Sequence, residues 1–387
     1  MKILWFTRRQ FDIDKLHMTT WREYYDALLD SGHNVKMAIA GHDTEHVWER
    51  PYIEIRVVKK KFLRLFIFWL DGYWKFIRSY ITFRPDAVIL DIYSIWFSIP
   101  FVLTRKRRSV FIVDNRTPHF DSCQQNSRLQ DTIMKFYTKL CYMYCRFFLN
   151  GMTVITAHYK QQVCCNYKFA DSQIGVLSSG VNIDKFILEK FSKKKPEYLV
   201  GKFVLMQHGE ISYNRGLFET VKALSLLSDD VCLLLIGESI KSNARNDLIA
   251  LVNKLGLEDR VYVLPPVSHA EIPKFIGYCD CAVMAYPNID YWNNNNPLKL
   301  LEYLALGKYL ICTDMWTFRN VIKQSKCAYY LQDNDPNNIA QAVRYAYGNR
   351  EKLVEWGKEG IGIVKEQYTW KKQAENLIYY IESLRHS

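Results

Sequence analysis

The 387-residue sequence lacks the features that mark several protein classes. It has no run of about 18 or more uncharged apolar residues, so no membrane-spanning helix is predicted. Its first residues, MKILWFTRRQFDID, lack the apolar core of a signal peptide and are typical of a first β-strand. No low-complexity block indicates disorder. The ten cysteines fall within apolar patterns such as KLCYMYCRF, which favours reduced, buried thiols over disulfides or structural zinc.

Acidic residues are scarce in the first half of the chain. Residues 51–150 contain 17 Lys and Arg against 7 Asp and Glu, whereas residues 196–387 contain 21 against 22. The formal net charge of +12 therefore comes from the N-terminal half. Such a field attracts anionic lipid, nucleic acid or a phosphorylated acceptor. The sequence has no recognisable nucleic-acid-binding motif, so a nucleic-acid partner is not expected.

Apolar segments of strand length alternate with helical patterns along the chain. They include KILWF, NVKMAIA, PDAVILDI, SVFIVDN and MTVITA, then FVLMQHG, VCLLLIG, RVYVLPP, CAVMAY and YLICTD. This alternation predicts α/β domains with parallel, doubly wound sheets. A linker-like stretch at 191–202 spans the boundary between two predicted domains, residues 1–192 and residues 193–365. Sheets of this kind bind ligands at the carboxyl ends of their strands.

The tract YWNNNNPLKLLEYLALG places turn-forming residues directly before a helical pattern. Pro297 suits the first helical position and Asn296 the N-cap. The free N–H groups at such a helix start, near Asn296 to Leu298, favour an anion. Glu302, more than one turn further on, could accept hydrogen bonds from a ribose diol. The alternative is that Asn295 and Asn296 only cap the helix and that Glu302 is an exposed acid.

The same tract carries a family resemblance. NPLKLLEYLALGKYLICTD resembles the nucleotide-sugar signature of retaining GT-B glycosyltransferases of family 4. Glu302 matches the second glutamate of that signature, which binds the donor ribose in the family. Asn294 stands where the family has the first glutamate, near the transferred sugar. Pro297 and Lys299 match a P-x-K-x-x-E-Y version of the motif.

A second segment, HGEISYNRGLFETVKAL, resembles the family loop in which an arginine and a lysine clamp the donor diphosphate. Gly209 lies at the start of this loop, and Arg215 matches the lysine position. Glu210 occupies the arginine position, which leaves Lys299 as a candidate for the second cation. The final stretch, QYTWKKQAENLIYYIESL, resembles the terminal helix, residues 366–387, that crosses back to the first domain in the family.

The segment FIVDNRTPHFD follows a predicted strand in the N-terminal half. Asp114, Arg116 and Thr117 match an Asp-x-Arg-Thr-Pro variant that lies beside the reacting sugar in the family. A buried ion pair between Asp114 and Arg116 is the alternative. His119 is close by, although a single loop histidine often has no special role.

The resemblance implies a retaining glycosyltransferase with two Rossmann-like domains facing across a cleft, in which residues 1–192 bind the acceptor and residues 193–365 bind a nucleoside-diphosphate sugar. It implies a role in surface-glycan or lipopolysaccharide assembly, with no cofactor and no metal. The spacing of Asp333 and Asp335 fits a metal site of another fold, but Pro336 makes helix capping the better explanation. The alternatives are a sugar-nucleotide epimerase of the same fold and an inactive membrane-bound scaffold. The expected catalytic residues are Asp114, Arg116, Arg215 and Glu302, and the expected substrate-binding residues are Thr117, His119, Gly209, Asn294, Asn295, Asn296, Pro297, Leu298, Lys299 and Glu302.

Residues 59–84, KKKFLRLFIFWLDGYWKFIRSYITFR, are both basic and aromatic. They predict two helices, or one helix broken at Gly72, with an apolar side and with Lys59, Lys60 and Lys61 near lipid headgroups. Such a surface binds a membrane interface without spanning it. The alternative is a core helix with a solvated basic edge. The chain is therefore expected in the cytoplasm, peripherally bound to the inner face of an anionic membrane.

Overall fold

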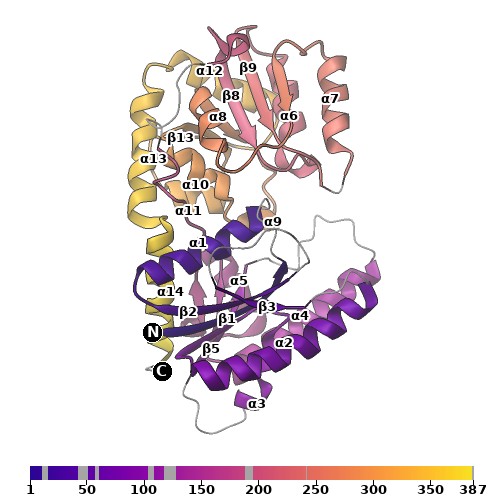
Figure 1. Ribbon diagram of the computed structural model, residues 1–387. Helices are drawn as coiled ribbons and strands as arrows, with labels where there is room; N and C mark the ends of the chain where they lie inside the picture. The colour runs from indigo at the N-terminus through magenta and orange to yellow at the C-terminus, as the bar shows by residue number, and fades with distance from the viewer. Residues whose placement is uncertain are drawn as a thin grey trace. The chain divides into compact units, whose positions relative to one another are not determined.

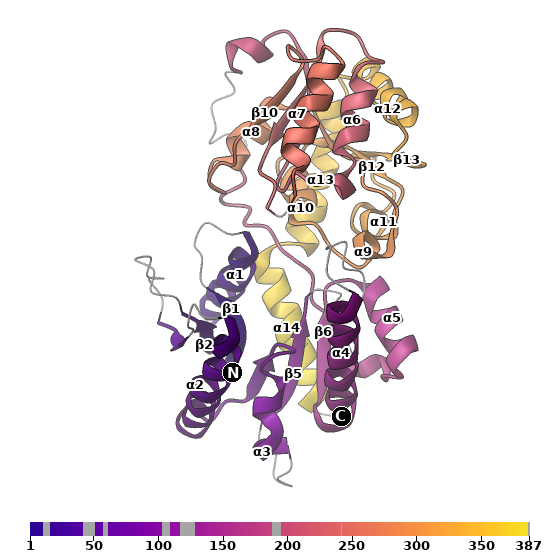
Figure 2. The ribbon, with the colours of Figure 1, turned by 90° about the vertical axis from the view of Figure 1, so that its right-hand side faces the viewer.

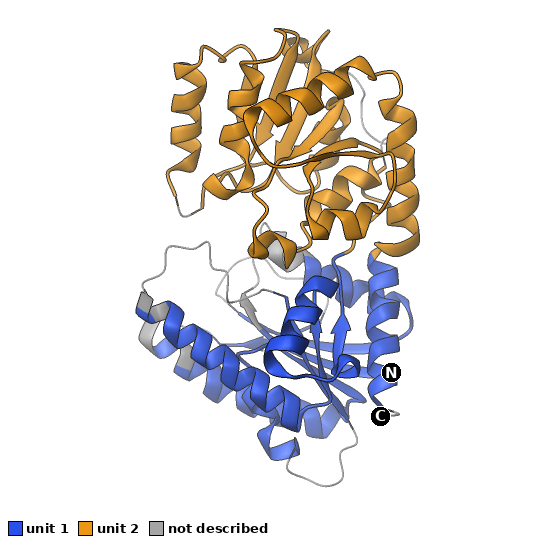
Figure 3. Cartoon of the chain, turned by 180° about the vertical axis from the view of Figure 1, so that it is seen from behind, with its two compact units in different colours: residues 1–179, 370–387 blue, residues 180–369 orange. Residues whose placement is uncertain are grey.

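The computed structural model describes residues 1–10, 16–41, 51–56, 61–102, 109–116, 128–187, 195–240 and 242–385. The chain forms two compact units, shown in different colours in Figure 3. Unit 1 contains residues 1–179 and 370–387, and unit 2 contains residues 180–369. The chain thus leaves unit 1 once and returns to it for its last helix.

Unit 1 is built on a seven-stranded sheet with the order β3-β2-β1-β4-β5-β6-β7, in which every neighbouring pair is parallel. The order runs outward in both directions from the adjacent strands β1 and β4, which is the doubly wound arrangement. Its strands are β1 (Lys2–Gln10), β2 (Asn34–Ala40), β3 (Ile53–Ile55), β4 (Ala87–Leu90), β5 (Val110–Asn115), β6 (Gly151–Val154) and β7 (Ile174–Val176).

Helices connect these strands, as the alternating sequence pattern predicts (Figure 1). They are α1 (Leu16–Asp30), α2 (Lys61–Phe83), α3 (Ile99–Val102), α4 (Arg128–Phe148) and α5 (Ala157–Tyr167), with 3-10 turns η1 (Ile95–Ser98) and η2 (Asp171–Gln173).

The expected break at Gly72 is wrong, because α2 runs through this residue without interruption. Gly72 is on the buried face of the helix. A Cβ atom there would lie 3.1 Å from Cζ of Phe97, which is tighter than an ordinary packing contact. The glycine therefore serves close packing of the Phe97 ring against α2, and the surrounding core holds the helix together despite the low helix propensity of glycine.

The last helix, α14 (Trp370–Arg385), belongs to unit 1 (Figures 1 and 2). The Trp370 ring packs edge-on against Tyr24 of α1, with ring centroids 5.2 Å apart. The Tyr380 hydroxyl donates a 2.6 Å hydrogen bond to the carbonyl oxygen of Gln173. A Cβ at Gly175 would lie 2.7 Å from the Tyr380 ring, so this glycine makes the close approach of α14 to the sheet feasible.

Unit 2 has a six-stranded parallel sheet with the order β10-β9-β8-β11-β12-β13. Segments such as FVLMQH and VCLLLI are buried throughout, because helices cover both faces of the sheet. The strands are β8 (Phe203–His208), β9 (Val231–Ile236), β10 (Val261–Leu264), β11 (Cys281–Met284), β12 (Tyr309–Thr313) and β13 (Ala328–Leu331).

The helices of unit 2 end with the long α13, which leads to the crossing back to unit 1. They are α6 (Leu217–Leu224), α7 (Ala244–Lys254), α8 (Ile272–Tyr278), α9 (Asp290–Asn293), α10 (Leu298–Ala305), α11 (Trp316–Ile322), α12 (Pro336–Gly348) and α13 (Leu353–Gln367), with 3-10 turns η4 (Glu197–Leu199) and η5 (Tyr213–Arg215).

The predicted fold class is confirmed: the chain is an α/β protein with two Rossmann-like, doubly wound sheets. Among the helices of the described residues, none combines the length and the apolar character that crossing a bilayer requires.

The packing of α14 predicts that Trp370→Ala destabilises unit 1. Truncating a buried aromatic side chain costs about 3–5 kcal/mol, from lost burial and from the cavity left behind. The free energy of unfolding, measured by denaturant titration, should fall by that amount. Tyr379→Ala on the same helix removes a side chain that is 76% exposed and should change it little. Equal losses in both variants would contradict the docking of α14 through Trp370.

Candidate functional site

The candidate site of unit 2 lies where its strand order reverses. Strands β8 and β11 are neighbours in the sheet, and the order continues outward from them in opposite directions. Ligands of doubly wound sheets bind at the carboxyl ends of such strands. Here these ends lead into the loop that starts at Gly209 and into the segment that contains Tyr286.

Glycines shape the loop between β8 and α6. Gly216 has a φ of +67°, in the left-handed region that suits glycine, and directly precedes α6. A Cβ atom at Gly216 would overlap the carbonyl oxygen of Ala285, so the loop can pass this close to the end of β11 only with glycine here. This constraint fixes the place of Arg215, the residue immediately before it.

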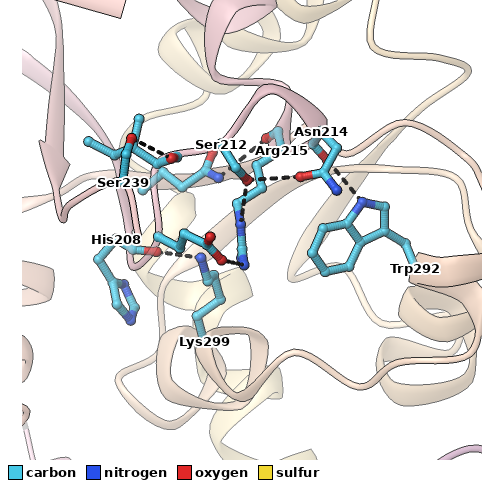
Figure 4. Close-up of polar contacts among 10 residues, drawn as sticks. His208, Ser212, Asn214, Arg215, Ser239, Trp292 and Lys299 are labelled. Atoms are coloured by element: carbon cyan, nitrogen blue, oxygen red, sulfur yellow. Dashed lines mark hydrogen bonds and ion pairs between the residues drawn. The ribbon is translucent and has the colours of Figure 1, made fainter. Parts of the chain in front are cut away.

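Arg215 is held on several sides, as Figure 4 shows. Its Nε donates to Oγ of Ser212 at 3.1 Å, and its Nη2 donates to Oε2 of Glu210 at 3.0 Å. The guanidinium lies 5.1 Å from the centroid of the Trp292 ring, and Trp292 Nε1 donates to the carbonyl oxygen of Asn214 at 2.9 Å. These contacts fix a planar, bidentate donor of the kind that suits a phosphate.

Burial of Arg215 opposes its charge, but nearby groups more than offset that effect. Its side chain is 16% exposed. Burial lowers the pKa of Arg215, whereas the Tyr286 hydroxyl and the Glu210 carboxylate raise it, and the net direction is upward. The guanidinium is therefore charged at any physiological pH.

Lys299 supplies a second buried basic group at the same place. Its Nζ donates to the carbonyl oxygen of His208, at the end of β8 (Figure 4). A Cβ at Gly209 would lie 2.9 Å from this Nζ, so the glycine leaves room for the ammonium. Burial, followed by repulsion from Arg215, lowers the pKa of Lys299 well below its usual value. The structure thus brings together three predicted residues, Gly209, Arg215 and Lys299, and an incoming anion would stabilise the charged form of the lysine.

Glu302 lies in α10 and is 3% exposed, so the interpretation of this residue as an exposed acid is wrong. Its Oε2 lies 2.8 Å from Nε2 of His208, and its Oε1 lies 2.7 Å from Nε2 of His269. His208 is buried, whereas the side chain of His269 is 34% exposed. Both printed partners of the Glu302 carboxylate are thus histidines, and the one from His269 lies nearer the solvent.

The hydrogen bonds assign the protonation of this cluster. The Tyr303 oxygen accepts from the backbone N–H of His208 at 3.1 Å and lies 2.8 Å from its Nδ1. Tyr303 therefore donates its hydroxyl proton to Nδ1, which leaves the proton of a neutral His208 on Nε2, facing Glu302. Burial lowers the pKa of His208, partly opposed by Glu302. Burial raises the pKa of Glu302, but hydrogen bonds from His208 and His269 outweigh it, and the net direction is downward.

Neither histidine was among the residues predicted from the sequence. His208 is the first residue of HGEISYNRGLFETVKAL, the segment that resembles the diphosphate-binding loop, whereas His269 follows the predicted strand segment RVYVLPP. Each is far from Glu302 along the chain, and only the folded sheet brings the three together.

The asparagine tract has a structural role that differs from the predicted one. Pro297, with φ −64° and ψ 123°, is the N-cap of α10, so the prediction of Asn296 as N-cap is wrong. The fixed φ of proline and its extended ψ place it just outside the helix, which begins at Leu298. Asn295 Nδ2 donates to the carbonyl oxygen of Tyr291 at 2.6 Å. Asn294 ends α9 as its C-cap and is buried.

Further contacts attach this tract to α11. The carbonyl oxygen of Asn295 accepts a 2.6 Å bond from Thr317 Oγ1, and Oδ1 of Asn293 accepts a 3.0 Å bond from the backbone N–H of Trp316. The tract therefore fixes the short connection between α9 and α10 against a third helix. This explains why residues that disfavour helix and strand occur in a row here.

In unit 1, Asp114 and Arg116 form a buried ion pair, with Nε and Oδ2 2.8 Å apart. Thr153 Oγ1 donates to the other carboxylate oxygen at 2.9 Å. The Arg116 guanidinium lies 4.7 Å from the Tyr24 ring centroid. Burial lowers the pKa of Arg116, but Asp114 and Tyr24 more than offset it. Thr117 and His119 lie outside the described residues.

Within the part of the chain that the structure describes, no group of three or more His, Cys, Asp or Glu side chains is arranged to hold a metal ion. Asp335 caps α12, because its side chain accepts a 2.8 Å bond from the backbone N–H of Asn337. The capping interpretation of this residue is confirmed.

Comparison with known proteins agrees with this geometry. The family model described as "Glycosyl transferases group 1" matches residues 189–382, about half of the chain. The chain belongs to the group 1 glycosyl transferases. The match includes the entire loop of Arg215 and the helix of Glu302. No curated protein is similar enough in sequence to count as a match.

Solved glycosyltransferase structures share the fold at low sequence identity. HepE from Anabaena, in complex with UDP, is 13% identical with a TM-score of 0.76, over 99% of this chain and 100% of that chain. A glycosyltransferase from Rickettsia africae is 18% identical with a TM-score of 0.74, over 100% and 99%. WaaG, a glycosyltransferase involved in lipopolysaccharide biosynthesis, is 13% identical with a TM-score of 0.66, over 97% and 99%. These similarities establish a GT-B fold for this group 1 glycosyltransferase.

The environment of His208 predicts that acidification destabilises the protein. Because folding lowers the pKa of His208 below its ordinary value of 6.5, the unfolded chain takes up this proton first as the pH falls. The free energy of unfolding should therefore decrease below about pH 6.5, by at most about 1.4 kcal/mol per pH unit. The lowered pKa of Glu302 adds a second loss below its ordinary 4.5.

Thermal unfolding measured between about pH 7.5 and pH 5.5 checks this prediction. His208→Gln should flatten the dependence, since glutamine does not titrate. His158→Gln, in α5 of unit 1, controls for the loss of a histidine elsewhere. An unchanged slope in His208→Gln would show that other groups cause the acid sensitivity.

Proposed function

We propose that this group 1 glycosyltransferase moves a sugar from a nucleoside-diphosphate sugar to an acceptor hydroxyl with retention of anomeric configuration. The observation that carries the proposal is the pair of buried basic side chains, Arg215 and Lys299, beside the glycine loop at the carboxyl end of β8. Arg215 already pairs with Glu210, but burial and Arg215 lower the pKa of Lys299, so its charged form needs a further anion nearby. A diphosphate, with negative oxygens on both phosphorus atoms, fits that need.

The proposed chemistry depends on the leaving group. As the bond between the anomeric carbon and the phosphate oxygen breaks, negative charge grows on the diphosphate. Donors already in position for that charge, here Arg215 and Lys299, are each worth about 3 kcal/mol in the transition state. We infer that these cations replace a metal ion, so that turnover persists after treatment with a chelator. Loss of activity on chelation would reject this part of the proposal.

Retention follows in the proposal from attack on the face that the diphosphate leaves. The acceptor oxygen bonds to the anomeric carbon on that face, and a phosphate oxygen takes the hydroxyl proton. No protein side chain forms a covalent bond to the sugar in this scheme. Glu302 is proposed to accept hydrogen bonds from the donor ribose, and a Glu302→Gln variant with unchanged calorimetric affinity for the nucleotide would reject that contact.

We infer that unit 1 binds the acceptor through Asp114 and Arg116. The Nη2 of Arg116 is buried and has no hydrogen-bond acceptor among the described residues, which supports a polar ligand at this point. Thr117 and His119 are proposed to contribute from the segment that follows. The structural similarity to WaaG and to the lipopolysaccharide outer core galactosyltransferase WaaB supports an acceptor in surface-glycan assembly. We propose a lipid-linked acceptor at the cytoplasmic face of the membrane.

A donor screen tests the proposed function directly. Ligand binding to the native state raises the melting temperature, so UDP-, GDP- and other activated sugars can be compared by thermal shift. Products of the donor that stabilises the protein are then analysed with and without acceptor glycans. A free, altered nucleotide sugar formed without acceptor would indicate an epimerase instead, and no reaction at all would indicate an inactive scaffold.

Arg215→Ala should reduce turnover about a hundredfold, the cost of losing one preorganised donor to the departing charge. The melting temperature should change far less than the activity, because the arginine lies in a loop rather than within the apolar clusters of unit 2. Arg319→Ala is the matched control, since this arginine is 48% exposed and pairs with Asp314 on the surface of the same unit. Full turnover in Arg215→Ala would exclude the proposed clamp.

Glu210→Gln should bind the donor more tightly. The Glu210 carboxylate accepts a hydrogen bond from Nη2 of Arg215, a donor that the proposed diphosphate needs, and the Glu210 side chain is 35% exposed. Removing the competing charge should raise the affinity by up to about fivefold, the value of a partly exposed ion pair. Isothermal titration with the nucleoside diphosphate measures this change. Weaker binding would mean that Glu210 positions Arg215 rather than competing for it.

A further inference from the structure

Two long helices of unit 1 expose large apolar side chains to an unusual degree. On α2 these include Phe66, Leu70, Trp74 and Ile81, each between 58% and 61% exposed. The corresponding row on α4 consists of Leu129, Ile133, Phe136, Leu140, Met143 and Phe147, which are between 39% and 70% exposed. Apolar patches of this size on a monomer mark interaction sites.

The spacing makes each row a single helical face. Successive members on α4 are four and three residues apart in turn, which places them above one another along one side of the helix. The opposite side of α4 carries Cys141 and Cys145, both fully buried. Phe68 and Phe76 are buried likewise on α2. Each helix is therefore apolar both toward the sheet and away from it, and packing within unit 1 explains only the inner face.

The two rows lie on the same side of the sheet. The turn η1 packs against both helices: the Phe97 ring lies 5.3 Å from that of Trp69 on α2, and Trp96 Nε1 donates to the Tyr137 hydroxyl on α4 at 3.1 Å. Side chains of α2, η1 and α4 share one buried cluster with strands β1, β4 and β5. Figure 2 shows α2 and α4 with α3 between them. The two outer faces and Ile99 of α3, which is 41% exposed, belong to one side of unit 1.

Cations border the apolar rows. Lys135 and Lys139 are exposed on α4, and Arg146 follows two turns later on the same flank, with its guanidinium 5.0 Å from the Phe147 ring. On α2 the Arg78 guanidinium lies 5.4 Å from the Trp74 ring. Asp71 of α2 is neutralised by Lys75 at 2.6 Å. A second copy of this chain would bring like charges together, whereas an anionic lipid surface complements them.

We propose that the outer faces of α2 and α4 together form a surface that inserts into the headgroup region of an anionic membrane. The apolar rows enter the boundary between headgroups and acyl chains, and the flanking lysines and arginines contact lipid phosphates. Both helices then lie parallel to the bilayer plane. From the sequence, residues 59–84 were the main basis of this expectation, and the segment KFYTKLCYMYCRFF extended it. The exposed apolar row of α4 adds to that surface, while Lys59 and Lys60 lie outside the described residues. The surface is separate from the residues proposed to bind the nucleotide sugar.

Vesicle flotation tests this inference without donor or acceptor. The full-length protein should float with vesicles of phosphatidylglycerol and phosphatidylcholine and remain largely unbound with phosphatidylcholine alone. Lys135→Gln/Lys139→Gln should reduce partitioning at low salt about tenfold or more, since each cation near an anionic surface contributes about a fivefold factor. Phe136→Ser/Phe147→Ser should reduce it at low and high salt alike. These substitutions affect exposed side chains, so folding should be preserved and is checked by thermal unfolding.

Tyr379→Ser and Lys371→Gln, exposed substitutions on α14 of the same unit, are the matched controls and should float like the unmodified protein. The inference is overturned if anionic vesicles do not capture the protein, or if both double variants float as well as the controls. It is also overturned if light scattering shows that the unmodified protein is a dimer and that the Phe136→Ser/Phe147→Ser variant is a monomer, because the surface then joins two copies of the chain. The activity of the protein on a water-soluble acceptor is measured in parallel, so that failure of membrane binding and failure of sugar transfer are told apart.

Discussion

Arg215 must remain charged where water is largely excluded, and the arrangement of unit 2 around β8 follows from that constraint. Burial of a cation costs several kcal/mol unless partners offset it. Here the partners are Ser212, Glu210 and the face of the Trp292 ring, all brought within reach by a loop that depends on Gly216. Lys299 differs, because burial and Arg215 lower its pKa, and its Nζ donates to the carbonyl oxygen at the end of β8. The loop is therefore shaped by electrostatics as much as by packing.

The Glu302 cluster is the counterpart of this arrangement. An ionised carboxylate in α10 is stabilised by two histidines, one buried and one partly exposed. The ring of the buried member also contacts the Tyr303 hydroxyl, whereas the side chain of His269 is partly exposed. The protein thus places a cation, Arg215, and an anion, Glu302, close to the carboxyl end of β8, each with its own hydrogen-bond partners. A ligand that carries both phosphate and hydroxyl groups can bind to both.

Much of the fold was predictable from the sequence, because it depends on local patterns. Buried strands such as VCLLLI appear as continuous apolar runs, and helices such as α4 show their period over many turns. The segments that contain Arg215 and Lys299 were likewise singled out through short motifs that resemble the family. The contacts of Glu302 with His208 and His269 were not predictable, since they join residues 94 and 33 positions apart through sheet packing. Gly72 was misjudged for a related reason: its role depends on Phe97, from another part of the chain.

Local rules also explain the error at Asn296. Proline is compatible with both the N-cap and the first helical position, and its ψ of 123° here places it at the N-cap. The partners of Arg215 and Lys299 include Trp292 and the carbonyl oxygen of His208, which come from distant parts of the chain. Glu302, whose predicted ligand would enter an already occupied hydrogen-bond network, needed the complete sheet.

The position of α14 has a consequence for synthesis of the protein. Because residues 370–387 belong to unit 1 and residues 180–369 to unit 2, unit 2 is a continuous segment, whereas unit 1 is interrupted by it. A ribosome delivers all of unit 2 before the helix that covers Tyr24 and Gly175 has emerged. Part of the apolar surface of the unit 1 sheet therefore stays exposed until α14 has been synthesised. Unit 2 can thus reach its native state before unit 1 does.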